Sequence, residues 1–120
     1  MDSPADDWTG RYLDELRTQR KLSSHTIAAY GRDLAELSAL AGHGDWVKLS
    51  HFEIRRFAAR LHAEGQSPTS IARKLSGWRG FYDWLSRQVA LAANPVDGVR
   101  APRRPKTLPK ALLEIGRAHV

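Results

Sequence analysis

The sequence predicts an all-α protein: a small bundle of four main helices followed by an extended basic segment. Along four stretches of the chain, large apolar residues recur at intervals of three and four, which places them on one face of a helix. Serine, proline and glycine residues separate these stretches, where they can cap or end helices. No alternating apolar and polar run, and no Asn-Gly turn, indicates a β-hairpin.

The first helix is expected over about residues 7–20. Asp6 and Asp7 lie at its start, where the helix dipole favours negative charge. Its apolar face comprises Trp8, Tyr12, Leu13 and Leu16.

The second helix follows the segment RKLSSHT, in which either Ser23 or Ser24 can serve as the N-cap. Its apolar residues keep a regular helical spacing and comprise Ile27, Tyr30, Leu34, Leu37 and Ala41. We expect Gly42 and Gly44, in the segment GHGD, to end this helix.

The third helix is expected to begin after Ser50. Ser50 and Glu53 fit the capping box, in which each side chain binds the other residue's backbone N–H. The helix should end near Gly65. Its predicted buried face comprises Phe52, Ile54, Phe57, Ala58 and Leu61.

The fourth helix is expected to start at Ser67 and Pro68, a cap followed by proline at the first helical position. Its predicted buried face comprises Ile71, Leu75, Trp78, Tyr82 and Leu85, with Phe81 beside them.

The segment AANPVDGVRAPRRPKTLPK, residues 92–110, contains four prolines, five basic residues and one acid. Proline cannot continue a helix and restricts the residue before it. Val96, Val99 and Leu108 are the only large apolar residues there, so we expect the segment to lie outside the packed core. This predicts a helical domain in residues 1–92 and an extended basic linker in residues 93–112.

Charge is distributed unevenly along the 120 residues, whose net charge is +6. Residues 1–15 contain five acids and one arginine, whereas residues 66–120 contain ten basic residues and three acids. This asymmetry favours a polyanionic partner for the second half. The chain has no cysteine, its start is acidic, and no apolar run is long enough to span a membrane. We therefore expect a cytoplasmic protein without a membrane partner.

The outer faces of helices two and four mix basic and small residues. They comprise Thr26, Ala29 and Arg32 on helix two, and Thr69, Ser70, Arg73, Lys74 and Gly77 on helix four. Small residues let a helix approach a grooved partner closely, while arginine and threonine can reach phosphates and base edges. The alternative is an ordinary solvated surface, which is our interpretation of Arg55, Arg56 and Arg60 on helix three.

No pattern indicates catalysis, a metal or a cofactor. The five histidines have no spacing typical of a zinc site, and no glycine-rich loop could cradle a phosphate. Tyr12, Tyr30 and Tyr82 all fall on apolar faces, so we expect core residues rather than nucleophiles.

Three stretches in order carry a resemblance to a known family: YLDELRTQRKLSSHTIAAYGRDL, SPTSIARKLSGWRGFYDWL and NPVDGVRAPRRPKTLPK. Together they resemble the N-terminal core-binding, SAM-like domain of tyrosine site-specific recombinases. The similarity is greatest to the XerC branch of the bacterial Xer family.

The resemblance implies a function. In that family the helical domain clamps one side of double-stranded DNA, a separate C-terminal domain carries the tyrosine nucleophile, and the linker crosses the duplex. A full protein of this kind would act on a recombination half-site without metal or ATP. It would work with a XerD-like partner in chromosome dimer resolution.

The resemblance also implies roles for individual residues. The outer-face residues of helices two and four would meet DNA, with Arg73 as a base contact, since arginine reads guanine with two hydrogen bonds. The expected phosphate contacts are Lys74, Arg100, Arg103, Arg104 and Lys106. We expect the domain alone to be a monomer without catalytic activity.

Residues 113–120, LEIGRAHV, depart from the family pattern, and we expect them to be a tail of vector origin. Two alternatives remain open for the rest of the chain. One is the core-binding domain of a phage or mobile-element integrase. The other is a helical protein-interaction module whose basic faces only aid solubility.

Overall fold

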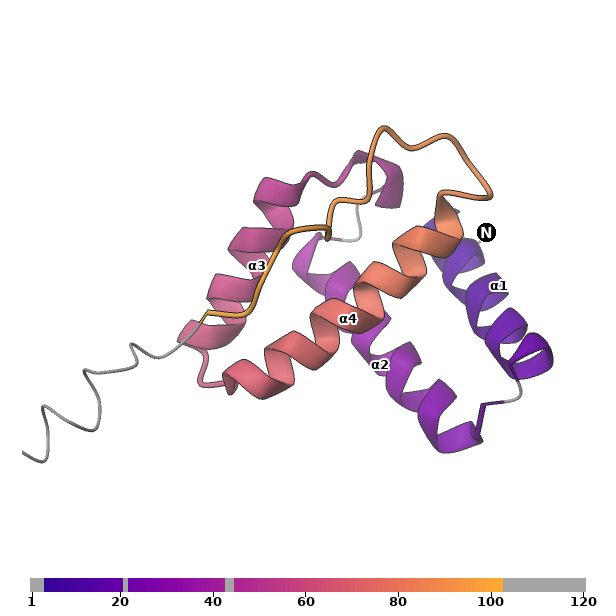
Figure 1. The fold of residues 1–120 in the computed structure, drawn as a ribbon, viewed down its shortest axis with the longest axis horizontal. Helices are drawn as coiled ribbons and strands as arrows, with labels where there is room; N and C mark the ends of the chain where they lie inside the picture. The colour runs from indigo at the N-terminus through magenta and orange to yellow at the C-terminus, as the bar shows by residue number, and fades with distance from the viewer. Residues whose placement is uncertain (1–3, 21, 43–44, 103–120) are drawn as a thin grey trace, which may run out of the picture.

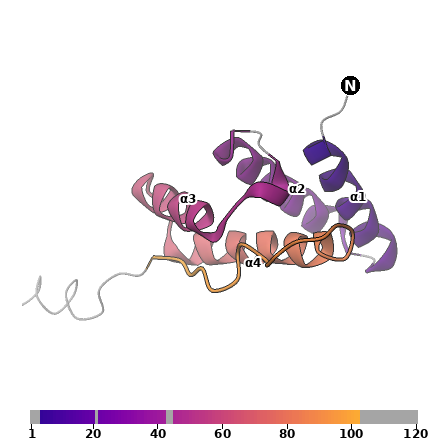
Figure 2. The same cartoon turned by 90° about the horizontal axis from the view of Figure 1, so that it is seen from above.

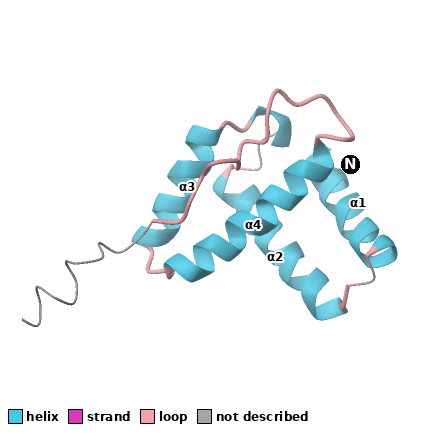
Figure 3. Ribbon diagram, in the orientation of Figure 1, coloured by secondary structure: helices cyan, strands magenta, loops and turns pink. Residues whose placement is uncertain are grey.

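A computed structural model describes residues 4–20, 22–42 and 45–102. Its elements are α1 (Pro4–Gln19), α2 (Ser24–Leu40), the short 3-10 helix η1 (Trp46–Lys48), α3 (His51–Ala63) and α4 (Pro68–Leu85). No strand occurs within the described ranges (Figure 3), and the prediction of an all-α fold with four main helices is confirmed.

Serine caps start three of the helices. The Ser23 hydroxyl accepts from the Thr26 N–H at 3.1 Å, so Ser23 rather than Ser24 caps α2. Ser50 and Glu53 form the predicted capping box at α3. Ser67 caps α4.

Two of the predicted helix-ending glycines adopt a left-handed backbone conformation. Gly42 follows α2 with φ 67°, and Gly65 follows α3 with φ 98°. Glycine reaches this region without the steric cost of a Cβ. Gly44 lies outside the described residues.

Helix α4 is central to the bundle, since it packs against α1, α2 and α3. Figure 1 shows it crossing α2 near the middle of both helices. Its predicted apolar face is buried, with exposures of 2% or less at Ile71, Leu75, Trp78, Phe81, Tyr82 and Leu85. These side chains are the middle of the core.

A cluster of aromatic rings joins α1, η1 and α4. The Phe81 ring packs edge-on against Tyr12 and Trp46, at centroid distances of 5.4 and 5.1 Å. The Tyr82 hydroxyl donates to the Trp46 carbonyl at 2.7 Å. Sequence reasoning did not identify Trp46, because η1 is too short to show a helical period.

The prediction that Phe52 belongs to the core is wrong, since its side chain is 68% exposed. Ile54, Phe57, Ala58 and Leu61 are buried as expected. Phe52 precedes Ile54 by two residues, which is about 200° around an α-helix, so the two side chains leave opposite faces.

The expectation that residues 92–110 stay outside the core is wrong for Val96 and Val99, whose exposures are 0% and 3%. The Asn94 amide donates to the Arg79 carbonyl at 3.1 Å and its Oδ1 accepts from the Val96 N–H at 2.9 Å. The chain thereby turns back along α4, as Figure 2 shows. The buried Val96 and Val99 and the hydrogen bonds of Asn94 attach the start of the segment to the bundle.

Candidate nucleic-acid interface

The crossing of α2 and α4 is fixed by the backbone and by a buried tryptophan. The indole Nε1 of Trp78 donates to the Asp33 carbonyl at 2.9 Å, and Trp78 is fully buried. At Gly77, an added Cβ would lie 3.7 Å from the Tyr30 ring and 3.8 Å from the Asp33 carboxylate. Gly77 is therefore part of the contact between the helices, and it is half-buried there.

Apart from Gly77 at the crossing, the predicted contact residues of both helices lie at or before the middle of their helices, and these N-terminal halves diverge from the crossing in Figure 1. Arg32 and Thr69 are exposed. Thr26, Ala29 and Ser70 are half-buried. The two sets of residues therefore lie on two helix halves that lead away from the same crossing.

Thr26 and Ser70 occupy equivalent positions, three residues after the cap of their helix. The Thr26 hydroxyl accepts from the Ser23 hydroxyl at 3.0 Å, and the Ser70 hydroxyl accepts from that of Ser67 at 3.2 Å. Each therefore keeps its own O–H to donate to another acceptor, such as a phosphate oxygen.

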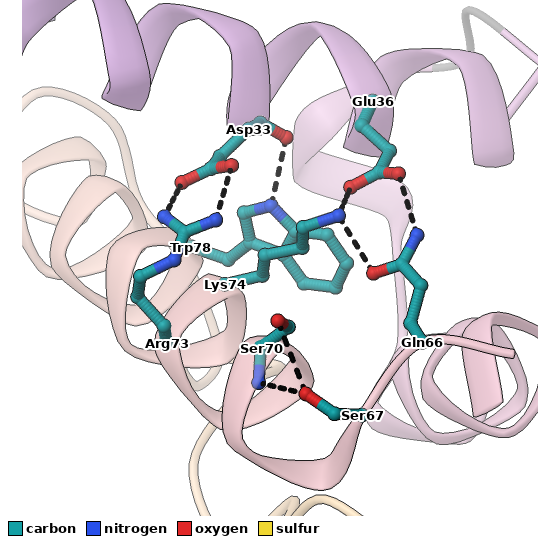
Figure 4. Close-up of polar contacts among 8 residues, drawn as sticks. All are labelled: Asp33, Glu36, Gln66, Ser67, Ser70, Arg73, Lys74 and Trp78. Atoms are coloured by element: carbon teal, nitrogen blue, oxygen red, sulfur yellow. Dashed lines mark hydrogen bonds and ion pairs between the residues drawn. The ribbon is translucent and has the colours of Figure 1, made fainter.

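Arg73 is held by a carboxylate of the facing helix, as Figure 4 shows. Its Nη1 lies 2.7 Å from Asp33 Oδ2 and its Nη2 lies 3.3 Å from Oδ1. The Asp33 side chain is 7% exposed, whereas that of Arg73 is 55% exposed. The hydrogen bond to Asp33 raises the pKa of the guanidinium above its ordinary value. Arg73 is therefore ionised and fixed on one side, and open to solvent on the other.

Lys74 belongs to a second network between the helices (Figure 4). Its ammonium lies 2.7 Å from Glu36 and donates to Gln66 at 2.7 Å, while the Gln66 amide donates to Glu36 at 3.4 Å. The Lys74 side chain is only 13% exposed. The expected contact of Lys74 with a phosphate remains a prediction. The Glu36 carboxylate already offsets part of the charge of this ammonium.

Arg32 and Arg100 are exposed and have no ion-pair partner among the described residues. Among the predicted contacts that the structure describes, these two have the charges most available to an anion. Arg103, Arg104 and Lys106 lie outside the described residues.

A cleft of about 860 Å³ lies between η1, the start of α3 and residues 91–100. Its lining includes His51, Arg55 and Arg100. Arg55, which the sequence placed on an ordinary solvated surface, therefore shares a cleft with a predicted phosphate contact. Only the return of the chain along α4 brings them together, so helical spacing alone could not indicate it.

The tyrosines on the predicted apolar faces are positioned as structural residues. Tyr82 is fully buried and Tyr12 is 8% exposed, and burial raises the pKa of both hydroxyls. Tyr30 is half-buried at the crossing.

Among the described residues, no group of three acidic or histidine side chains is placed to hold a metal ion. Nor is any helix in the described part long and apolar enough to span a membrane.

The all-α fold of four main helices is consistent with a SAM-like domain. Residues 10–89 match the family model described as phage integrase, N-terminal SAM-like domain, and the chain belongs to this family.

Several curated relatives carry a more specific name. The chain is 55% identical over 108 residues to Tyrosine recombinase XerC 1 of Ralstonia nicotianae, covering 86% of the chain and 33% of the relative. It is 52% identical to Tyrosine recombinase XerC of Ralstonia pickettii, over 84% of the chain and 32% of the relative. For the Pseudomonas aeruginosa XerC the identity is 43%, over 84% and 34%. The chain thus spans about a third of these relatives, and no solved structure matches it.

Proposed function

We propose that this chain is the DNA-binding N-terminal domain of a XerC-like tyrosine recombinase. It clamps one side of a recombination half-site during the strand exchange that resolves chromosome dimers. The single observation that carries the proposal is the 55% identity to Tyrosine recombinase XerC 1 over 86% of the chain. The parent protein would act in the cytoplasm with a XerD-like partner, and its C-terminal domain would supply the catalytic residues.

The geometry supports a division of labour among the contact residues. The charges of Arg32 and Arg100 are exposed and have no ion-pair partner in the described part of the chain, and they suit phosphates, since such contacts need charge but no fixed direction. The hydroxyls of Thr26 and Ser70 suit hydrogen bonds to phosphate oxygens at the helix starts. Arg73, held in one orientation, suits a base edge.

The basic linker would extend this surface. Five basic residues follow Ala92 up to Lys110, and prolines keep such a chain extended. Arg103, Arg104 and Lys106 would follow the phosphates of the duplex toward the second domain. Together with Arg100 they would contribute affinity that does not depend on base sequence.

The test is binding of the 120-residue chain to a fluorescent DNA duplex at a series of salt concentrations, followed by anisotropy. Affinity should fall linearly with salt on a double-logarithmic plot, with a slope of about −0.9 for each phosphate contact. Arg32→Ala should reduce the magnitude of that slope by about 0.9. Arg56→Ala, which removes one exposed charge from α3, should leave it unchanged.

The absence of duplex binding at low salt would contradict the proposal. The helical protein-interaction module would then be the better interpretation. Equal effects of the Arg32 and Arg56 changes would mean that binding follows net charge alone, without the proposed surface.

A further inference from the structure

The four charged side chains between α2 and α4 form two opposed pairs. Asp33 and Glu36 of α2 face Arg73 and Lys74 of α4, at 2.7 Å in each pair. A surface that serves only to attract phosphates gains nothing from carboxylates set against its cations, because each one cancels a charge. The two ion pairs therefore have a role other than the attraction of phosphates.

Asp33 is unusually well fixed for a charged residue. Among the described residues it is the one charged residue that is buried, with 5% exposure. Its own carbonyl accepts from the indole of Trp78, at the centre of the core. The carboxylate thus has a position set by the core and little freedom to turn toward water.

The pair leaves part of the guanidinium free. Arginine has five N–H donors in a planar fork, and Asp33 engages one donor on each Nη. The Nε–H and the neighbouring Nη N–H have no hydrogen-bond partner among the described residues, and in the planar group they point in parallel from a second edge of the fork. Two parallel donors match the O6 and N7 acceptors of guanine in the major groove.

Fixing this side chain changes the balance between affinity and discrimination. A free arginine can turn to any nearby phosphate, and it loses rotamer freedom when it binds a base. An arginine already paired to a buried carboxylate has lost that freedom, and its attraction to phosphates is partly cancelled. It would contribute less to binding of any duplex and more to the choice among duplexes.

We propose that Asp33 is a positioning residue that holds Arg73 for a guanine contact and suppresses its use as a phosphate contact. The proposal rests on the proposed function, because it concerns how the same surface selects its DNA. The duplex it implies carries a guanine opposite the first half of α4.

The experiment compares Asp33→Asn with Asp14→Asn. Asp14 also pairs with an arginine, Arg17, at 2.6 Å, but on the exposed surface of α1. Each change removes one negative charge and keeps the size of the side chain. Affinity is measured for a duplex selected by the chain from a random-sequence pool and for a shuffled version of it.

Asp33→Asn should tighten binding to the shuffled duplex, increase the salt slope by up to about 0.9, and lower the selected-to-shuffled affinity ratio. Asp14→Asn should leave that ratio unchanged. An Asp33→Asn variant with the same ratio and slope as Asp14→Asn would overturn the proposal and leave Asp33 as a structural partner only.

Arg73→Lys gives a second readout if Asp33→Asn does not fold. Lysine keeps the charge but cannot form two parallel hydrogen bonds on each of two edges. The ratio should therefore fall while the salt slope is retained, and an unchanged ratio would overturn the proposal. Salt-dependent binding of the unchanged chain without sequence preference would overturn this inference alone. No binding to any duplex would overturn the proposed function as well.

Discussion

Trp78 connects the core to the candidate interface through a single side chain. Its ring is fully buried, and its Nε1 is bonded to the backbone of Asp33, whose carboxylate in turn holds Arg73. The position of the outer guanidinium is thus set by packing in the centre of the domain.

Trp78→Ala should lower the free energy of unfolding by about 3–5 kcal/mol, because it leaves a large cavity between α2 and α4. Trp78→Phe keeps much of the ring volume but leaves the Asp33 carbonyl without its partner, and should cost about 1–3 kcal/mol. Urea unfolding followed by circular dichroism measures both. A loss below about 1 kcal/mol for Trp78→Ala would contradict the central position of this residue.

At the residue scale the sequence predicted most of the buried apolar side chains but not how the polar side chains pair. Arg73 was identified from the outer face of its helix, whereas its partner lies 40 residues away in the chain. The sequence does contain a signal that Asp33 needs a partner. Asp33 falls three residues after Tyr30 and four before Leu37, so a carboxylate occupies the apolar face of α2 and needs a partner.

At the scale of elements, periodic segments were predictable and irregular ones were not. The four helices follow from spacing and caps, and Ser23, Ser50 and Ser67 cap α2, α3 and α4. The irregular segment along α4 has no period, and composition alone placed it outside the core. Its attachment depends on the turn at Asn94, which only the arrangement of α4 makes favourable.

Val96→Ala should lower the free energy of unfolding by about 1–3 kcal/mol, because this side chain is fully buried against the bundle. Asp97→Ala is the matched control, since the neighbouring side chain is exposed and lies 3.8 Å from Arg79. It should change the free energy by less than about 0.5 kcal/mol. Equal losses in urea unfolding would mean that residues 94–99 do not belong to the core.

At the scale of the whole molecule, the helix crossing sets what the domain presents to a partner. Because α4 packs against all three other helices, its first half has a fixed direction relative to the first half of α2. Caps, small residues and exposed arginines then lie on two diverging helix halves of one bundle. A duplex would meet a preformed surface rather than a set of independent side chains.

The location of that surface can be measured by NMR, by titrating a ¹⁵N-labelled chain with a short duplex at low salt. The backbone signals of residues 24–33 and 68–77 should shift, together with the Arg73 Nε–H and the amide of Arg100. Signals in the outer face of α1, including Asp14 and Arg17, should stay in place. Shifts confined to α1, with α2 and α4 unchanged, would contradict the assignment of the DNA-binding surface to the crossing of α2 and α4.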